Sequence, residues 1–517
     1  MANYPSIFND VIGPVMRGPS SSHCAAAVRI GRLCRELMEG KIDEMNIKFD
    51  PNGSLATTHE SQGSDMGFFA GLLGWEAFDE RLPSYKSAIA DAGMKINIEI
   101  TDISASHPNT YEIELRNKRE IRRLTALSTG GGMIEIIKID GAELLIEGDY
   151  FETLVYTSNS EKVKMFFENN FVFDELNICL GKESFIEIKA QRFPDEELLN
   201  ELKKLDEVKS IKKLSPVLPI LSRKNIEVPF TNCEEMLEYN KDKNLDLWEL
   251  AVHYESARGN LNHDEVREKM KAIVKIMRDS VELGLKGTEY KDRILGNQSK
   301  NFKARIDNNT LIGGEVINRI ILYVTAIMEV KSSMGVIVAA PTAGSCGALP
   351  GAVLGIADSM KINEDKIVKA MIASAIIGVF ISKHSTFAAE VGGCMAECGS
   401  GSGMAAAALV YLADGTLEQS ISAASVALQN SFGMTCDPIA NRVEAPCLGK
   451  NIMAATNALS CANMALANYN HLIPLDEVID SMAEVAESMP RTLRCTALGG
   501  LSMTKSAKEI EKRLNTS

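Results

Sequence analysis

The first part of the chain changes its hydrophobic period several times. Residues 45–49 and 95–100 alternate between apolar and polar side chains, which predicts strands. Residues 25–38 instead repeat apolar positions every three to four residues, which predicts a helix. We therefore expect an α+β domain over residues 1–148.

A second pattern follows over residues 149–214. The periodicity predicts the order strand, helix, strand, strand, helix, strand, at residues 150–157, 160–168, 172–180, 184–190, 195–205 and 208–213. This βαββαβ order is the ferredoxin-like supersecondary pattern. We expect a small separate domain here.

Three prolines without clear periodicity mark residues 215–237 as a linker. From residue 238 to 517 the periodicity is helical, and between Lys331 and Asn470 only 16 of 140 residues are charged. Helices that are apolar on all sides must be buried. The sequence therefore predicts a multidomain protein in which an α+β part is followed by an all-α helical domain.

Composition narrows the class of protein. The 517 residues carry a net charge of -14, which would repel a polyanion, so we expect no nucleic-acid partner. The most apolar windows are short for a bilayer span and no leader precedes them, so we expect no membrane and a cytoplasmic location. The odd number of cysteines, eleven, argues against a disulfide framework.

Three cysteines stand out by their neighbours. Cys436 and Cys447 lie beside or near proline, which fixes the backbone, and Cys394 follows two glycines, which allow close approach of a bulky group. Rigid thiolates around a bulky object suggest a metal cluster. The alternative is that all three are buried structural thiols, the usual state of free cysteine.

Several long motifs then make the sequence resemble a known family. The segments APTAGSCGALPG (340–351), VGGCMAECGSGSGMAAAA (391–408) and CDPIANRVEAPCLGKN (436–451) resemble the α part of iron-sulfur L-serine dehydratases. The segments IGPVMRGPSSSH (12–23), NGSL (52–55), HPNT (107–110) and GGGMIEI (130–136) resemble the β part. The resemblance implies that both parts are fused in this chain. Residues 149–214 occupy the position of the family's ACT-like regulatory module.

The resemblance also implies a cofactor. In the family three cysteines hold a 4Fe-4S cluster, and the matching positions are Cys394, Cys436 and Cys447. Three ligands for four irons leave one iron open, and an open position distinguishes a catalytic metal centre from a structural one. A Lewis acid would help expel the hydroxyl of serine, giving pyruvate and ammonia after hydrolysis of the imine.

The same resemblance implies the residues of the amino-acid site. Ser20, Ser21, Ser22 and His23 offer hydroxyls and an imidazole in one loop, where His23 would be catalytic, although a serine run is more often a solvated turn. The matching motifs add the expected substrate-binding residues His107, Asn109, Thr342 and Asn451. HPNT by itself would ordinarily be a turn.

Some positions depart from the family pattern. Gln62 stands where a histidine is usual, Cys495 replaces a glutamate, and residues 384–389 read HSTFAA in place of the usual NASISG. The acid/base role could therefore have moved to His384, or the substrate could differ. The C-terminal cysteine that covers the fourth iron in some relatives has no counterpart. Cys398 or Cys495 could replace it, or each could be a structural thiol.

The resemblance therefore predicts an L-serine ammonia-lyase that takes a small amino acid and forms a homo-oligomer, most simply a dimer. Two alternatives stay open: an L-cysteine desulfidase, in which the same iron accepts a thiol, and a non-catalytic amino-acid sensor. The ACT-like segment lacks the usual glycine before its first helix, at Ser158, so sensing and a purely architectural role both remain possible.

Overall fold

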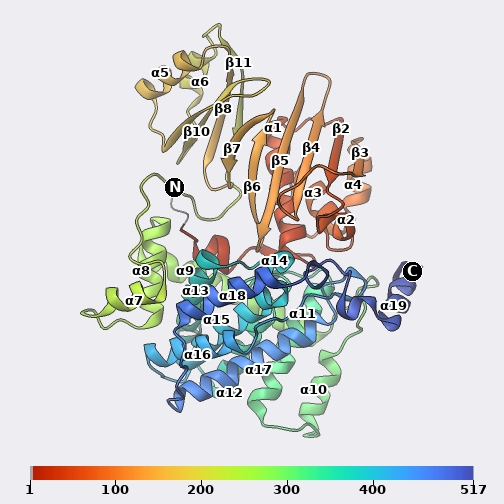
Figure 1. The fold of residues 1–517 in the computed structure, drawn as a ribbon, viewed down its shortest axis with the longest axis vertical. Helices are drawn as coiled ribbons and strands as arrows, with labels where there is room; N and C mark the ends of the chain where they lie inside the picture. Colours follow the sequence, from red (N-terminus) through yellow and green to blue (C-terminus); the bar gives the residue numbers. More distant parts are fainter. Residues whose placement is uncertain (1–3, 516–517) are drawn as a thin grey trace.

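The computed structural model describes residues 4–515 and has an α+β part stacked on a helical domain (Figure 1). The ferredoxin-like sheet and a larger six-stranded sheet form the upper half, and the helices fill the lower half. The predicted fold class, an α+β part followed by an all-α domain, is confirmed.

The first domain is built on the six-stranded sheet, with strand order β3-β2-β4-β5-β6-β7. Its strands are β2 (Glu44–Phe49), β3 (Lys95–Ile100), β4 (Thr110–Arg116), β5 (Ile121–Gly130), β6 (Met133–Ile139) and β7 (Ala142–Ile146). Its helices are η1 (Ile7–Val11), η2 (Ser21–Ala25), α1 (Ala26–Leu37), α2 (Leu55–Thr58), α3 (Ser64–Leu72), η3 (Leu82–Ser84) and α4 (Tyr85–Asp91). Alternate strand residues such as Met45, Ile47 and Phe49 are buried against α1 and α3, as expected for a half-buried sheet.

The ferredoxin-like domain follows the predicted order. Its elements are β8 (Phe151–Thr157), α5 (Ser160–Asn170), β9 (Glu175–Cys179), β10 (Phe185–Ala190), α6 (Glu196–Leu202) and β11 (Val208–Leu214). The sheet order is β11-β8-β10-β9, all antiparallel. The second strand, β9, is shorter than the predicted 172–180, because it begins only at Glu175. Val172 is 89% exposed and lies outside the ladder.

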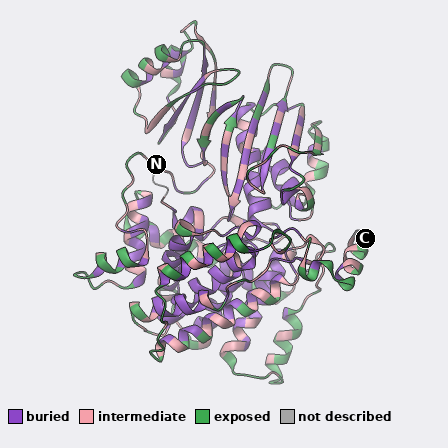
Figure 2. Cartoon of the chain, viewed as in Figure 1, coloured by how far each residue is buried: buried purple, intermediate pink, exposed green. Residues whose placement is uncertain are grey.

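The helical domain surrounds two apolar helices. Its elements are α7 (Cys233–Asn240), α8 (Leu247–Gly259), α9 (His263–Lys286), α10 (Ser299–Asp307), α11 (Glu315–Ser332), α12 (Ala348–Met360), α13 (Glu364–His384), α14 (Ala389–Cys394), η4 (Met395–Gly399), α15 (Ser400–Leu412), α16 (Leu417–Gln429), η5 (Ile439–Asn441), α17 (Cys447–Leu466), α18 (Leu475–Ser488), η6 (Arg491–Leu493), η7 (Gly500–Met503) and α19 (Lys505–Asn515). Helix α15 packs against α12, α13, α16 and α17 and is buried along nearly its whole length (Figure 2). Helix α13 is long and apolar enough to cross a membrane, but 78% of that stretch is buried inside the protein.

The glycines of the GSGSG run serve close helix packing. A Cβ on Gly403 would lie 2.9 Å from the side chain of Leu428, and one on Gly399 would lie 2.5 Å from Ser431 Oγ. Both distances are too short for an alanine, so α15 and its neighbours approach one another only because these side chains are missing.

The two halves are joined by backbone pairing. Strand β1 (Val15–Met16) pairs antiparallel with β12 (Ile337–Val338), so one strand comes from each half of the chain. The serine loop that follows β1 and the Ala340–Gly344 segment that follows β12 therefore meet at the interface between the domains.

Candidate functional site

The serine loop is held inside the protein. Ser20 precedes η2, which carries Ser21, Ser22 and His23, and all four side chains are buried. The Ser128 hydroxyl donates to the Ser22 carbonyl oxygen at 2.6 Å. Ser21 Oγ accepts from the Ala343 N–H of the helical domain at 3.1 Å. The loop is thus fixed from both domains.

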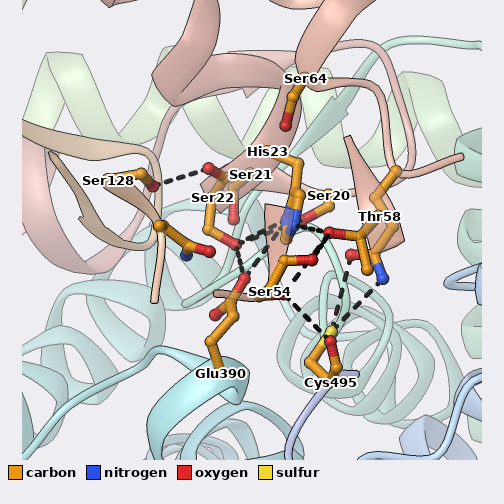
Figure 3. Close-up of polar contacts among 12 residues, drawn as sticks. Ser20, Ser21, Ser22, His23, Ser54, Thr58, Ser64, Ser128, Glu390 and Cys495 are labelled. Carbon is orange, nitrogen blue, oxygen red and sulfur yellow. Dashed lines mark hydrogen bonds and ion pairs between the residues drawn. The ribbon is translucent and has the colours of Figure 1, made fainter. Parts of the chain in front are cut away.

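His23 lies at the centre of this group (Figure 3). Its Nε2 is 2.8 Å from Thr58 Oγ1, and Thr58 in turn donates its hydroxyl hydrogen to the Ser54 carbonyl at 2.7 Å. Thr58 Oγ1 must therefore accept, which puts the ring proton on Nε2 and leaves Nδ1 as a lone pair. Nδ1 lies 3.1 Å from Ser20 Oγ, and complete burial lowers the pKa of the ring.

Glu390 brings a carboxylate to the same group. It lies in α14, and its Oε1 accepts from Ser22 Oγ at 2.6 Å and lies 3.3 Å from His23 Nδ1. Its Oε2 is buried and has no hydrogen-bond partner in the part of the chain that the structure describes. Because an unmet buried acceptor is costly, this oxygen is suited to a donor from a bound molecule.

Asn109 and His107 lie in the loop before β4. The Asn109 backbone N–H donates to His107 Nδ1 at 3.2 Å, and burial lowers the pKa of His107. Asn109 is fully buried, yet neither its amide oxygen nor its amide nitrogen has a hydrogen-bond partner among the described residues. A buried amide with both ends unpaired is unusual, and it indicates a place where a polar ligand would bind.

Five buried thiols gather on the helical side of the interface. Cys394 ends α14, Cys398 lies in η4, and Cys447 begins α17, while Cys436 and Cys495 lie in loops. Cys394 is hydrogen-bonded to Cys398 and to Cys436, and Cys436 also to Cys495. Ligand atoms of Cys394, Cys436 and Glu397 lie within 4.8 Å of one another, so this group could hold a metal ion.

The charge beside these thiols favours a thiolate. Hydrogen bonds from Cys398 and Cys436 lower the pKa of Cys394 well below its usual range, and the Lys450 ammonium 3.8 Å from its Sγ lowers it further. Lys450 is anchored by Asp437 Oδ1 at 2.6 Å. Burial raises the pKa of Glu397 to about 8, and Thr342 Oγ1 donates to this carboxyl group at 2.6 Å.

Asn451 is joined to this cluster in a different way. Its Oδ1 accepts from the Gly347 and Ala348 N–H groups, each at 3.1 Å, and its Nδ2 donates to the Gly344 and Cys447 carbonyls at 2.8 and 2.9 Å. All four of these hydrogen bonds are made to backbone groups of the protein. This amide therefore links residues 344–348 to the start of α17, and its substrate-binding role stays a prediction.

His384 does not join the other candidates. It is exposed at the end of α13, and its Nε2 lies 3.3 Å from the Thr231 carbonyl in the segment between the domains. On one side of the interface lie the serine loop, His23, His107 and Asn109, and on the other lie Thr342, Asn451, Cys394 and Cys436. Cys447 is not in the group whose ligand atoms lie within 4.8 Å of one another, and Asn451 Nδ2 links its carbonyl to Cys398 Sγ.

Glu390 and Lys450 belong to the site but were not among the residues predicted from the sequence. Glu390 lies four residues before Cys394, with the non-helical Gly393 between them, and Lys450 lies three residues after Cys447. This spacing alone could have indicated both. Gln62 and Cys495, both departures from the family pattern, contact each other: Gln62 Nε2 is 3.4 Å from Cys495 Sγ.

The fold and this site define a two-part protein, in which a helical domain with a thiol cluster faces a serine- and histidine-containing loop of an α+β domain. Residues 242–502 match the family model described as serine dehydratase alpha chain, so the chain belongs to this dehydratase family. It is 34% identical over 285 residues to the probable L-serine dehydratase alpha chain of Bacillus subtilis (strain 168), covering 55% of this chain and 95% of that one.

Two further relatives account for the rest of the chain. The probable L-serine dehydratase beta chain of the same Bacillus strain is 32% identical over 220 residues, covering 41% of this chain and 99% of that one. The L-serine dehydratase of Helicobacter pylori (strain ATCC 700392 / 26695) is 26% identical over 504 residues, covering 94% and 96% of the two chains. The protein is therefore a serine dehydratase family member with its β and α parts fused.

Proposed function

We propose that this chain is an iron-sulfur-dependent L-serine ammonia-lyase, which eliminates water from L-serine or a close β-hydroxy amino acid to give pyruvate and ammonia. The observation that carries the proposal is the meeting of the buried thiol cluster with the His23–Glu390 group at one domain interface. The names of the relatives support the substrate. We expect the protein in the cytoplasm, where its thiols stay reduced.

The donors fit a 4Fe-4S cluster by their chemistry. Soft thiolates are the ligands of iron-sulfur clusters, and five buried thiols from separate segments lie together here. Gly393, with φ of +65°, lets the chain turn into Cys394 where a side chain would collide with the Met434 carbonyl at 2.8 Å. We assign Cys394, Cys436 and Cys447 as the ligands. When bound, a cluster with one iron free of thiolate would supply a Lewis acid toward the substrate hydroxyl.

The chain's own residues bind the amino acid. The unpaired amide of Asn109 and the hydroxyl of Ser20 offer donors for the substrate carboxylate, while the Ser22 hydroxyl is committed to Glu390 Oε1. The unpaired Glu390 Oε2 offers an acceptor for the substrate ammonium. Ser20, Asn109 and Glu390 are all buried, and a low local dielectric strengthens a charged contact.

His23 is suited to take the α-proton. Burial keeps the imidazole neutral, and the bond to Thr58 leaves the lone pair on Nδ1. Once Nδ1 holds a proton, the imidazolium lies 3.3 Å from Glu390 Oε1, so the proton transfer forms an ion pair inside the protein. This pairing would stabilise the charge that develops on the ring.

The test is anaerobic purification followed by iron and sulfide analysis and by assays of pyruvate and ammonia from L-serine. We expect a cluster that is lost in air together with activity. Sulfide release from L-cysteine far above ammonia release from L-serine would contradict the choice of substrate. A protein that holds a cluster and turns over neither amino acid would contradict the enzymatic proposal.

A further inference from the structure

A cavity of about 570 Å³ lies between the two halves of the chain, next to the residues assigned to catalysis. Its walls come from residues within 57–66 and 83–86 of the α+β domain, from residues within 331–334 and 440–444 of the helical domain, and from α19. Two lining residues, Thr57 and Ser61, lie on either side of Thr58 in the sequence, and Thr58 bonds to His23 (Figure 3). The volume is in the range of small-molecule sites, about 300–1,000 Å³.

Lys331 is a buried cation in the wall of this cavity. It lies in the last turn of α11 and is 1% exposed. Within residues 4–515 its ammonium donates one hydrogen bond, to the Val443 carbonyl, and forms no ion pair. An ammonium has three donors, and a neutral carbonyl does not compensate its charge. Because a buried charge is costly unless it is paired, this group is suited to bind an anion.

The other basic side chains of the wall contact carboxylates. These pairs are His59 with Asp65 at 2.9 Å, Lys86 with Glu60 at 2.7 Å, and Arg442 with Asp292 through two contacts of 2.6 Å. Among the described residues that line the cavity, Lys331 is therefore the one basic side chain that contacts no carboxylate.

The carboxylates of the wall are also satisfied. Besides Glu60 and Asp292, the wall contains Glu444, which accepts from the Ile294 and Leu295 N–H groups at 2.7 and 2.8 Å, and Glu511, which lies 2.9 Å from Lys508 Nζ. Asn441 Oδ1 has no hydrogen-bond partner in the described chain, but a neutral amide oxygen does not balance an ammonium. A ligand with a positive group would therefore find no free counter-charge in this wall.

We propose that this cavity binds a small carboxylate anion that carries no ammonium group, with the Lys331 ammonium as its cationic contact. Pyruvate, the acid that the proposed reaction releases, has this chemistry, whereas L-serine is a zwitterion. The choice of pyruvate as the ligand rests on the proposed function. The anion site itself rests only on the wall, and none of the lining residues belongs to the serine loop, the His23–Glu390 pair or the thiol cluster.

A different role for Lys331 would be to balance the charge of the thiol cluster. Burial raises the pKa of Glu397 and of Cys447, and the Lys331 charge opposes both rises. Direct contact with a thiol is instead made by Lys450, whose Nζ lies 3.8 Å from Cys394 Sγ. Iron content separates the two roles, because an anion-binding lysine can be replaced without loss of iron.

The test is calorimetric titration of the anaerobically purified, full-length protein with pyruvate, acetate, chloride and phosphate. Pyruvate should bind the wild type and Asn109→Ala equally, since this variant weakens only the site assigned to the substrate. Lys331→Gln can still donate to the Val443 carbonyl but has no charge, so it should weaken pyruvate binding at least about tenfold and keep its iron. Lys86→Gln is the matched control, because it removes a cation of the same wall that is already paired, and its effect should stay below about threefold.

Inhibition kinetics give a second measurement. Pyruvate bound outside the substrate site should lower kcat for L-serine more than it raises KM, and this inhibition should weaken in Lys331→Gln together with the binding. Thermal unfolding checks that each variant is folded, and Lys331→Met takes the place of the glutamine variant if that variant does not fold. If the protein turned over no L-serine, binding of pyruvate that depends on Lys331 would still support the anion site, and only the proposed function would fail.

Four results would overturn the inference. The first is that pyruvate does not bind, or binds Lys331→Gln as tightly as the wild type. The second is that binding is lost in Asn109→Ala and inhibition is purely competitive with L-serine, which would place the anion in the substrate site. The third is that chloride or phosphate binds as tightly as pyruvate, which would mean a general anion site. The fourth is a loss of iron in Lys331→Gln that accounts for the lost binding, which would assign this lysine to the cluster.

Discussion

Ser22 and Glu390 lie 368 positions apart in the sequence, yet the Ser22 hydroxyl donates to Glu390 Oε1 at 2.6 Å and both side chains are buried. This bond joins the α+β domain to the helix that carries Cys394. It ties the group that would handle the proton to the group that would hold the metal.

Replacing Glu390 by glutamine removes the charge and keeps the shape. His23 then loses the anion that opposes the effect of burial, so its pKa falls further. Because His23 accepts a proton only when neutral, the rising limb of the pH–rate profile should move to lower pH. We expect kcat to fall about 100-fold, since the imidazolium loses its partner. An exposed control, Glu484→Gln, should behave as wild type, and an unshifted pH limb would exclude His23 as the base.

The assigned ligands can be tested by iron retention. Cys394→Ser, Cys436→Ser and Cys447→Ser should each lose iron and sulfide after anaerobic reconstitution, because a hydroxyl is a poor ligand for the cluster. Cys461→Ser is the matched control, since Cys461 is a buried thiol bonded to Asn430 and Asn457 away from the cluster. Full iron content in any of the first three variants would show that Cys398 or Cys495 is the third ligand.

Lys450 should support the cluster without binding it. Lys450→Met removes the ammonium next to Cys394 Sγ and leaves Asp437 with the Leu501 N–H but without its cation, so an uncompensated carboxylate stays beside the thiolates. We expect iron affinity to fall about 10- to 100-fold, as for other groups that orient metal ligands. Competition with a chelator measures this affinity independently of turnover. The exposed Lys505→Met variant is the control, and equal chelator resistance in both proteins would rule out the role.

Asn109 and Asn451 should respond differently to the same change. Asn109→Ala removes an amide without partners, so unfolding stability should stay equal or rise, while KM increases about tenfold through loss of one substrate hydrogen bond. Asn451→Ala removes an amide whose atoms bond to four backbone groups, so it should destabilise the fold by about 2–3 kcal/mol. Denaturant unfolding and steady-state kinetics of both variants separate the two roles. A stability loss in Asn109→Ala would contradict a substrate role.

A pH dependence of stability follows from Glu255. Burial raises the pKa of this carboxyl group to about 7, where it accepts from Ser6 Oγ at 2.6 Å and from the Ile7 N–H at 2.8 Å. Since the native state holds the proton more tightly than the unfolded chain, its contribution is full below about pH 4.5 and is lost as the pH rises through 7. Relative to Glu255→Gln, the wild type should lose about 3 kcal/mol between pH 4.5 and 8. A constant difference between the two proteins over this range would contradict the assignment.

Local pattern explains most of what could be predicted. Alternation along residues 45–49 and 95–100 and the βαββαβ order were visible because they depend on neighbouring residues. The predicted length of strand β9 is too great, because Val172 is apolar and yet lies outside the sheet. A single sequence does not show whether an apolar residue next to a strand is paired in the sheet or exposed to solvent.

The site depends on contacts that no local pattern records. The gathering of Cys398 and Cys495 with the three assigned ligands, and the exposure of His384, follow from how α13, α14 and the C-terminal loop pack. The contact between Gln62 and Cys495 shows that the two departures from the family pattern lie against each other. An amide and a thiol thus replace an imidazole and a carboxylate as a pair, which no single motif could reveal.

The short pairing of β1 with β12 bears on how the molecule could be divided. Its strands come from residues on either side of the segment 215–232, so a break in that segment would leave each piece with one strand and an unsatisfied edge. Two such fragments, expressed together, would each supply what the other lacks. The peptide bonds that join the two halves would then ensure that both are made in equal numbers. They would not be needed to align β1 with β12.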